Sequence, residues 1–281
     1  MKVQMAKRSS IYYLYGLTFP LGETRGNDSL ILGIEGAPVK FFTIKGLCVV
    51  YSKVPVEKYS EDSLESKVKN PYWVEDRARE HYEAQSAVMH RARTMLPFKF
   101  GTLFKSKKGL KKYIASRHQC AEELLTNLTD KQEWSVKVFA DKDKLKMEVV
   151  RLNPDFKLAI EAQRDNRKGT NFLLAKKLLR EIDLVANSYA REQACSLTDA
   201  LEDLSVGWRQ NETFTLSEQG NDEMIANFAF LVQLDSIHNF QSVIDVFNDR
   251  QPNGTIYAHY TGPWLPYNFV NELGVEPCVS A

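Results

Sequence analysis

Short runs of alternating apolar and polar positions dominate the first part of the chain, and they predict β-strands. Residues 11–17 are rich in aromatic and branched side chains and end near glycine and proline, which is typical of a strand. Residues 39–44 and 47–52 form two further runs on either side of the dipeptide Lys45-Gly46. A two-residue connection of this kind predicts a tight hairpin.

An apolar stripe with helical spacing begins after Pro71. Its positions recur at steps of three and four residues, and proline is favoured in a first turn, so we predict a helix here. The stripe comprises Val74, Ala78, His81, Gln85, Val88 and Ala92. Residues 96–104 follow as a predicted strand, with Pro97 at an edge or as the first residue. A second helix is predicted over residues 108–128.

The second half opens with residues 134–140, which alternate between apolar and polar positions and predict a half-buried strand. The charge-rich residues 141–146 come next, and a short helix is expected after Pro154. A long helix is predicted over residues 169–206, and its length indicates that part of it projects or pairs with another helix. Its first stripe comprises Phe172, Ala175, Leu179, Ile182, Ala186 and Tyr189, and a later, rotated stripe comprises Leu197, Leu201 and Leu204.

The remaining elements complete a recognisable order. Strands are predicted at residues 213–216, 225–234 and 255–260, with a helix at residues 237–247 between the last two. The order strand, helix, strand, strand, helix, strand is the split-βαβ pattern of a ferredoxin-like unit.

We therefore predict an α+β fold with two domains. Each is expected to be a ferredoxin-like or modified ferredoxin-like antiparallel sheet with helices on one face. A chain of 281 residues is longer than a domain with one small hydrophobic core usually is, which favours two domains. We expect residues 1–130 to form an N-terminal α+β domain. Residues 131–281 then form the C-terminal domain, with the long helix and an aromatic, proline-rich tail.

That tail, residues 261–270, contains a Gly-Pro pair, a second proline and three aromatic rings. Proline fixes φ and lacks a backbone donor, so the tail is not expected to continue as an inner strand or a helix. Large rings gain most by packing on the protein. We expect the preceding strand to stop at Tyr260 and the tail to lie against its own domain.

Composition narrows the function classes. Lysine plus arginine (37) nearly cancels aspartate plus glutamate (36), so no global field favours nucleic acid or an anionic membrane. No run reaches the roughly 18 apolar residues of a membrane helix. The start of the sequence lacks the apolar core of a signal peptide, and the four cysteines are far apart. These features indicate a cytoplasmic protein with reduced thiols.

Catalytic and ligand-binding signatures are missing from the sequence. It contains no GxSxG, GxxxxGK[ST] or GxGxxG motif, and its five histidines lack the spacing of metal ligands. We therefore expect no enzyme activity, no cofactor and no metal. The basic run 105–112 is one local charge asymmetry, but the adjacent strand does not match the motif of an RNA-binding domain. A solvated helix start explains such a run, so nucleic acid is not expected as a partner.

Four segments carry a resemblance to a known family. Residues 12–17 resemble an opening "YLYG" strand, residues 96–104 a "PLRFGT" strand, and residues 133–138 an "EW-V-V" strand. Residues 261–269 are nearly the closing "TGPWPPYNF" motif, with Leu265 where a proline is usual. In this order they resemble the gas vesicle protein family GvpF/GvpL, and the shared motifs do not separate the F branch from the L branch.

The resemblance implies a non-enzymatic accessory protein of gas vesicles, either an assembly factor or a minor structural component. Its implied partners are the hydrophobic shell protein GvpA and other accessory proteins, and its implied location is the gas vesicle in the cytoplasm. Exposed apolar surfaces of shell subunits aggregate unless they are covered, and a sheet edge or helix can cover them. The candidate partner-binding residues are Leu178, Ile182, Leu197, Leu201, Trp264 and Tyr267, although internal packing explains each one singly.

Two other function classes stay open. A ferredoxin-like regulatory module that binds a small ligand without catalysis requires a well-formed pocket with converging polar groups. An enzyme requires an activated side chain in a cleft.

Overall fold

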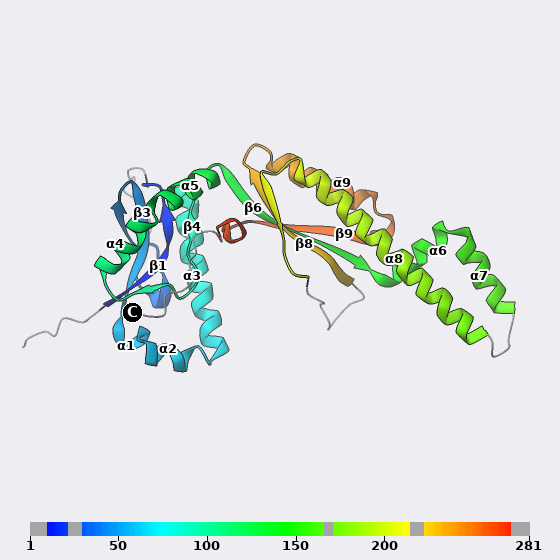
Figure 1. The fold of residues 1–281 in the computed structure, drawn as a ribbon, viewed down its shortest axis with the longest axis horizontal. Helices are drawn as coiled ribbons and strands as arrows, with labels where there is room; N and C mark the ends of the chain where they lie inside the picture. Colours follow the sequence, from blue (N-terminus) through cyan, green and yellow to red (C-terminus); the bar gives the residue numbers. More distant parts are fainter. Residues whose placement is uncertain (1–9, 22–29, 166–170, 214–221, 271–281) are drawn as a thin grey trace, which may run out of the picture. The chain divides into compact units, whose positions relative to one another are not determined.

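The computed structural model describes residues 10–21, 30–165, 171–213 and 222–270. The chain divides into two compact units (Figure 1). The N-terminal unit comprises Met1–Lys131 together with Leu265–Ala281, and the C-terminal unit comprises Gln132–Trp264. The polypeptide therefore passes from one unit to the other twice.

The N-terminal unit contains an antiparallel sheet in the order β2-β3-β1-β4, with β5 also paired to β1. Its strands are β1 (Ser10–Thr18), β2 (Lys40–Ile44), β3 (Leu47–Pro55), β4 (Leu96–Pro97) and β5 (Leu103–Phe104). The predicted hairpin is present: Ile44 pairs with Leu47, and Lys45 and Gly46 take φ angles of 50° and 86°. Two positive φ angles define the turn type that suits a two-residue hairpin.

Helices pack on both faces of this sheet. They are α1 (Val56–Tyr59), α2 (Glu61–Lys67), α3 (Pro71–Ala92), α4 (Lys107–Ser116) and α5 (His118–Leu128). The side chain of Asn70 caps α3, and Pro71 opens it as predicted. Helix α3 packs on the face that carries Tyr13 and Tyr15. Helix α4 places its lysines over Phe42 on the opposite face, so the expectation of helices on a single face is wrong for this sheet.

Two predicted elements of this unit are each split in two. The strand predicted over residues 96–104 is interrupted by a turn in which Gly101 has a φ of 81°, and only β4 and β5 remain. The helix predicted over residues 108–128 breaks at Arg117, which separates α4 from α5. Neither break follows from the apolar spacing, because that spacing continues across both of them.

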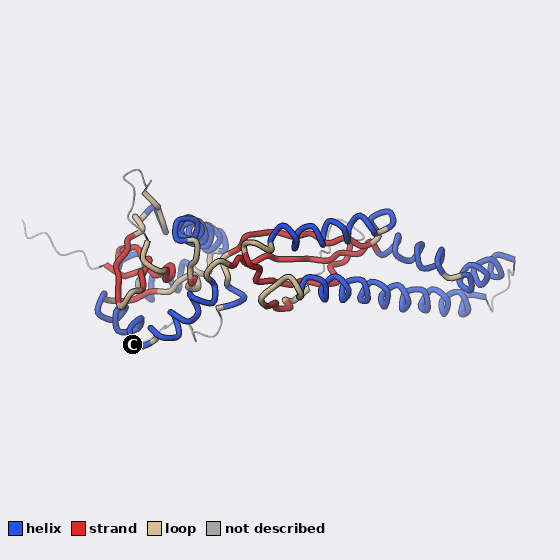
Figure 2. The backbone as a smooth tube through the Cα atoms, turned by 90° about the horizontal axis from the view of Figure 1, so that it is seen from above, coloured by secondary structure: helices blue, strands red, loops and turns tan. Residues whose placement is uncertain are grey.

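The C-terminal unit is a four-stranded sheet in the order β7-β8-β6-β9. Its strands are β6 (Lys131–Asp141), β7 (Gly207–Gln210), β8 (Asp222–Gln233) and β9 (Ile256–Trp264), and its helices are α6 (Lys142–Leu152), α7 (Pro154–Asp165), α8 (Asn171–Glu202) and α9 (Ile237–Arg250). This connectivity is the predicted ferredoxin-like arrangement. Figure 2 shows α8 and α9 side by side across one face of the sheet.

Two details differ from the sequence-based expectation, and a third expectation lies outside the described residues. Helix α6 begins inside the charged stretch, because Asp141 caps it by accepting from the backbone N–H groups of Asp143 and Lys144. The strand expected at residues 213–216 lies outside the described residues after position 213, as does the side chain of Phe172. On α8 the buried position is Leu178, whereas Leu179 is 62% exposed.

The fold class is thus confirmed: α+β, with two antiparallel sheets and a long helix in the C-terminal half.

Candidate functional site

The closing aromatic segment is divided between the two units. Strand β9 does not stop at Tyr260 but runs through Gly262 and Pro263 to Trp264, which corrects the expected strand end. Proline is tolerated there because β9 is an edge strand, paired with β6 alone. A Cβ on Gly262 would lie 2.9 Å from the ring of Trp134, so only glycine fits beside that ring.

Beyond Trp264 the chain enters the N-terminal unit, where Leu265 is buried with the α3 side of the core. The sequence assigned the whole tail to the C-terminal domain, and these contacts correct that assignment. Trp264 itself stays in the C-terminal unit, 39% exposed, and its Nε1 donates to Thr261 Oγ1 at 3.0 Å. The two predicted tail residues, Trp264 and Tyr267, therefore belong to different units.

Tyr267, in the short 3-10 helix Tyr267–Phe269, inserts its hydroxyl into a buried polar network. Gln85 Nε2 donates to the carbonyl oxygens of Tyr15 and Phe98, at 2.7 and 2.9 Å. These two bonds orient the amide, so Gln85 Oε1 faces Tyr267 and accepts from its hydroxyl at 2.7 Å. Burial raises the pKa of Tyr267 to about 12, so the hydroxyl keeps its proton.

His81 lies at the centre of the same network. Its Nε2 donates to the Phe98 carbonyl at 3.0 Å, and its Nδ1 accepts from the Tyr13 hydroxyl at 3.0 Å. The Tyr13 oxygen in turn accepts from the Gly101 backbone N–H at 3.1 Å. Burial lowers the pKa of His81 to about 4, so the ring is neutral near pH 7. This network fixes the tail to β1, α3 and the Phe98 turn.

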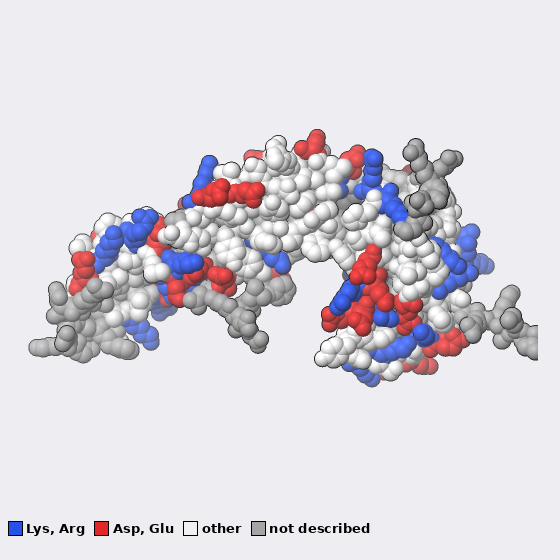
Figure 3. All heavy atoms as spheres, turned by 180° about the vertical axis from the view of Figure 1, so that it is seen from behind, with Lys and Arg blue, Asp and Glu red and all other residues white. Residues whose placement is uncertain are grey.

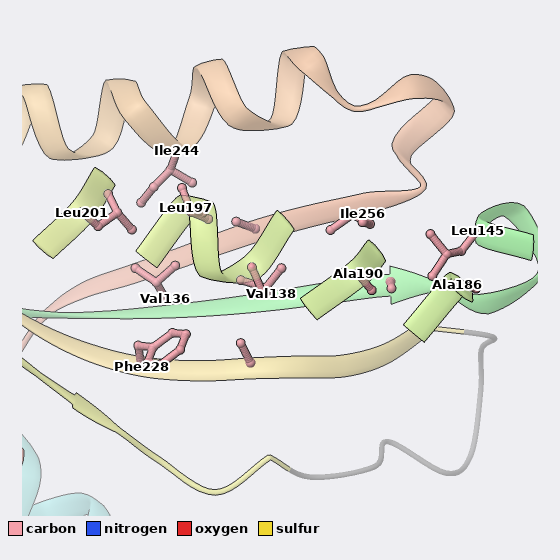
Figure 4. Close-up of a cluster of buried hydrophobic side chains, with 14 of the residues drawn as sticks. Val136, Val138, Leu145, Ala186, Ala190, Leu197, Leu201, Phe228, Ile244 and Ile256 are labelled. Carbon is pink, nitrogen blue, oxygen red and sulfur yellow. The ribbon is translucent and has the colours of Figure 1, made fainter. Parts of the chain in front are cut away.

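The other four predicted residues form part of the C-terminal core. Leu178, Ile182, Leu197 and Leu201 are all buried, along with the alanines between them on α8. Figure 4 shows Leu197 and Leu201 above Val136, Val138 and Phe228 of the sheet. These leucines hold α8 on its own sheet and are not available to a partner.

A different set of apolar side chains, on α6, α7 and α8, is exposed to solvent. We call it the apolar band, and it comprises Met147, Leu152, Leu158, Leu173, Leu174, Leu179, Leu184 and Val185. It extends over α6, α7 and the first half of α8, which lie beyond the end of the strands in Figure 1. Leu173 is the most exposed of them, at 72%. Leu173 and Leu184, eleven residues apart, lie on the same side of α8, and several large exposed apolar side chains in one part of a chain are typical of an interaction surface.

Sequence reasoning missed the apolar band. The signal was present, because Leu173, Leu174 and Leu184 stand off the helical stripe that faces the sheet. A helix with leucines on more than one side needs a second apolar neighbour.

The C-terminal unit also has a groove between α8 and α9, of about 450 Å³. Tyr189, Val243 and Phe247 line it, together with Gln193 and Gln251, which hydrogen bond to each other at 3.3 Å. This bond uses one donor of Gln251 and one acceptor of Gln193 within the protein.

Signs of metal chemistry or membrane insertion are also missing from the part of the chain that the structure describes. In those residues no three histidine, cysteine, aspartate or glutamate side chains gather as metal ligands. Nor does any described helix combine the length and apolarity needed to cross a membrane.

Comparison with known proteins identifies a matching family and several relatives. The family model "Gas vesicle synthesis protein GvpL/GvpF" matches residues 11–271. Gas vesicle protein F of Dolichospermum flosaquae is 26% identical over 92% of this chain and 96% of its own length. Gas vesicle protein L of a Streptomyces species is 23% identical, over 92% of each chain.

Solved structures agree in fold. The crystal structure of GvpF from Anabaena sp. PCC7120 superposes with a TM-score of 0.70 at 22% identity, covering 93% of this chain and 98% of the other. GvpF from Microcystis aeruginosa gives a TM-score of 0.62 at 21% identity, covering 93% and 99%.

Proposed function

Because the chain belongs to the gas vesicle synthesis protein GvpL/GvpF family, we propose that it acts in gas vesicle formation by binding the hydrophobic shell protein GvpA. It does so as an assembly factor or as a minor structural component. Other gas vesicle accessory proteins are its further partners, and it works in the cytoplasm and at the gas vesicle. The role requires neither catalysis nor a cofactor.

The apolar band is the observation that carries this proposal. Eight large apolar side chains on α6, α7 and α8 are exposed to solvent. Covering a leucine side chain contributes about 1.5–3 kcal/mol, so a partner with an apolar face gains most here. A shell subunit before polymerisation presents such a face, and helices pack against it through residues one turn apart.

The buried residues that the sequence nominated have a supporting part. Leu178 and Ile182 anchor α8 beneath the band, and Leu197 and Leu201 anchor its second half on the sheet. The outward leucines are thus displayed on a helix that is fixed by its own core, which reduces the ordering cost of binding.

Co-purification tests the proposal. Tagged protein and GvpA are co-expressed, and the amount of GvpA retained is compared between the natural chain and the double variant Leu173→Gln/Leu184→Gln. We expect a severalfold loss of GvpA in the variant. The matched control is Leu30→Gln/Leu32→Gln, which replaces two other exposed leucines, in the N-terminal unit. Equal retention of GvpA by both variants would contradict the proposal.

A deletion strain gives the second test. Removal of the gene, where no paralogue is present, is expected to abolish vesicles, and the band variant is expected to restore fewer vesicles than the control variant. Normal vesicle numbers in the deletion strain would exclude a role in assembly.

A further inference from the structure

One face of the N-terminal unit combines lysines with aromatic rings. The Nζ atoms of Lys107 and Lys111, on α4, lie 4.9 and 5.8 Å from the ring centroid of Phe42, on β2. Lys53 Nζ lies 5.5 Å from the ring of Tyr12. Rings beneath ammonium groups hold them by cation–π attraction.

Further contacts join this face into one surface. Tyr12 stacks on Tyr51, and Tyr51 packs edge-on against Phe42. His118 at the start of α5 hydrogen bonds to the carbonyl of Lys45 in the β2–β3 turn. We call this surface the basic face, and define it by Lys40, Lys45, Lys53, Lys107, Lys111 and Arg117. Figure 3 shows the molecule from the other side, where the lysine and arginine side chains of this unit are interspersed with aspartate and glutamate.

The charge of the basic face is not balanced locally. Residues 38–56 and 99–121 contain ten lysines and arginines and no aspartate or glutamate. Across the described ranges, none of the six residues of the basic face forms an ion pair with a carboxylate. The chain as a whole is nearly neutral, so this concentration of cations is local and attracts an anionic partner.

Among the residues that the structure describes, no strand pairs with the outer edge of β2, which lies beside the basic face. Strand β2 is the outermost strand of its sheet. The two-residue turn makes Ile44 and Leu47 a hydrogen-bonded pair. Hydrogen-bonded and non-hydrogen-bonded pairs alternate along an antiparallel ladder, so the backbone N–H and C=O groups of Phe41 and Thr43 point away from β3. Both residues are exposed, so an extended chain can pair with them.

We propose that the basic face binds an acidic, extended segment of a partner protein, which adds to the edge of β2. Lysines placed alongside that edge neutralise the carboxylates of the segment while the backbone groups pair. Nucleic acid fits less well, because the rings of Phe42, Tyr12 and Tyr113 already lie under lysine or arginine and are not free to stack on bases. This surface is separate from the apolar band and does not depend on GvpA.

Lysines at a sheet edge also protect a protein from aggregation, and the test must separate that role from binding. The probe is a fluorescein-labelled peptide of about ten residues that alternates glutamate with valine, measured by anisotropy on the full chain. A peptide that alternates lysine with valine controls for charge sign, and oligothymidylate of similar charge represents nucleic acid.

Two pairs of variants make the test specific. Lys107→Glu/Lys111→Glu reverses two charges, and glutamate suits the first turns of a helix, so α4 is expected to form. Lys69→Glu/Arg93→Glu is the matched control, with the same charge change at exposed positions on the α3 side. Thr43→Pro removes an outward N–H, whereas Thr43→Val keeps it.

We expect the acidic peptide to bind, to weaken as salt rises, and to lose about tenfold in affinity with Lys107→Glu/Lys111→Glu but not with its control. Thr43→Pro is expected to weaken binding about fivefold relative to Thr43→Val. Unchanged affinity in the Lys107→Glu/Lys111→Glu variant overturns the proposal. So does tighter, equally lysine-dependent binding of oligothymidylate, or equal binding by the two Thr43 variants.

Discussion

The hydroxyl of Tyr267 donates to Gln85 Oε1 at 2.7 Å, across a separation of 182 residues. Tyr267 belongs to the closing aromatic motif, and Gln85 belongs to the inward stripe of α3. A motif that reads as a tail is therefore part of the core of the N-terminal unit.

Tyr267→Phe is expected to destabilise the N-terminal unit by about 1–3 kcal/mol, because Gln85 Oε1 is left buried without a donor. Urea unfolding of the full chain measures the change. Tyr72→Phe removes a hydroxyl from an exposed ring and is expected to change the free energy of unfolding by less than about 0.5 kcal/mol. A Tyr267→Phe variant as stable as the natural chain would show that the bond adds nothing.

Stability is expected to fall in mild acid because of His81. Its pKa is about 4 in the folded chain against 6.5 ordinarily, so the unfolded chain takes up a proton first as the pH falls. The contribution of neutral His81 is complete above pH 6.5, declines from there to about pH 4, and is then lost, in total about 3 kcal/mol.

The variant His81→Gln cannot gain that proton. Its free energy of unfolding is expected to vary less between pH 6.5 and pH 4 than that of the natural chain, when both are measured by urea titration. Parallel pH profiles would mean that His81 is not the titrating group.

Leu201→Ala is expected to cost about 2–5 kcal/mol, because the side chain is 1% exposed in the core and its removal leaves a cavity. Leu184→Ala, on the same helix but 63% exposed, is expected to cost less than about 0.5 kcal/mol. Thermal denaturation of the two variants compares them directly. Similar losses would contradict the division of α8 into a core side and a solvent side.

Gly16→Ala is expected to destabilise the N-terminal unit by on the order of 2 kcal/mol or more. A Cβ at this position would lie 2.6 Å from the backbone oxygen of Leu96 and would overlap the side chain of Met95. The methionine can move, but the backbone of β4 is held by its pairing with β1. An alanine variant with an unchanged midpoint of thermal unfolding would refute this.

Elements defined by local chemistry were predictable from the sequence. The Lys45-Gly46 turn and the Pro71 helix start follow from patterns within a few residues, and the ferredoxin-like topology of the C-terminal unit follows from the succession of its strands and helices. The division of the tail between the two units was not predictable, because it depends on the contact of Tyr267 with Gln85, which is far away in the sequence.

The candidate partner-binding residues that the sequence suggested on α8 are buried, whereas other side chains of that helix are exposed. Periodicity identifies the buried side of α8, so it selected Leu197 and Leu201, which serve the core. Leu173 and Leu184 remain exposed after α8 has packed on its neighbours. Which apolar side of the helix remains exposed depends on tertiary packing, which a single sequence does not specify. The hypothesis of an apolar partner surface on this helix stays a prediction, now at these exposed positions.

The two crossings of the chain between the units, at Lys131–Gln132 and Trp264–Leu265, determine when folding can finish. Although most of the N-terminal unit precedes the C-terminal unit in the chain, its residues Leu265 and Tyr267 follow the whole of that unit and are synthesised after it. Until Leu265 and Tyr267 emerge, the sites beside Gln85 and His81 are open to water. The N-terminal core can therefore close only after residues 132–264 have been synthesised, and a fragment that ends at Lys131 lacks the segment that completes it.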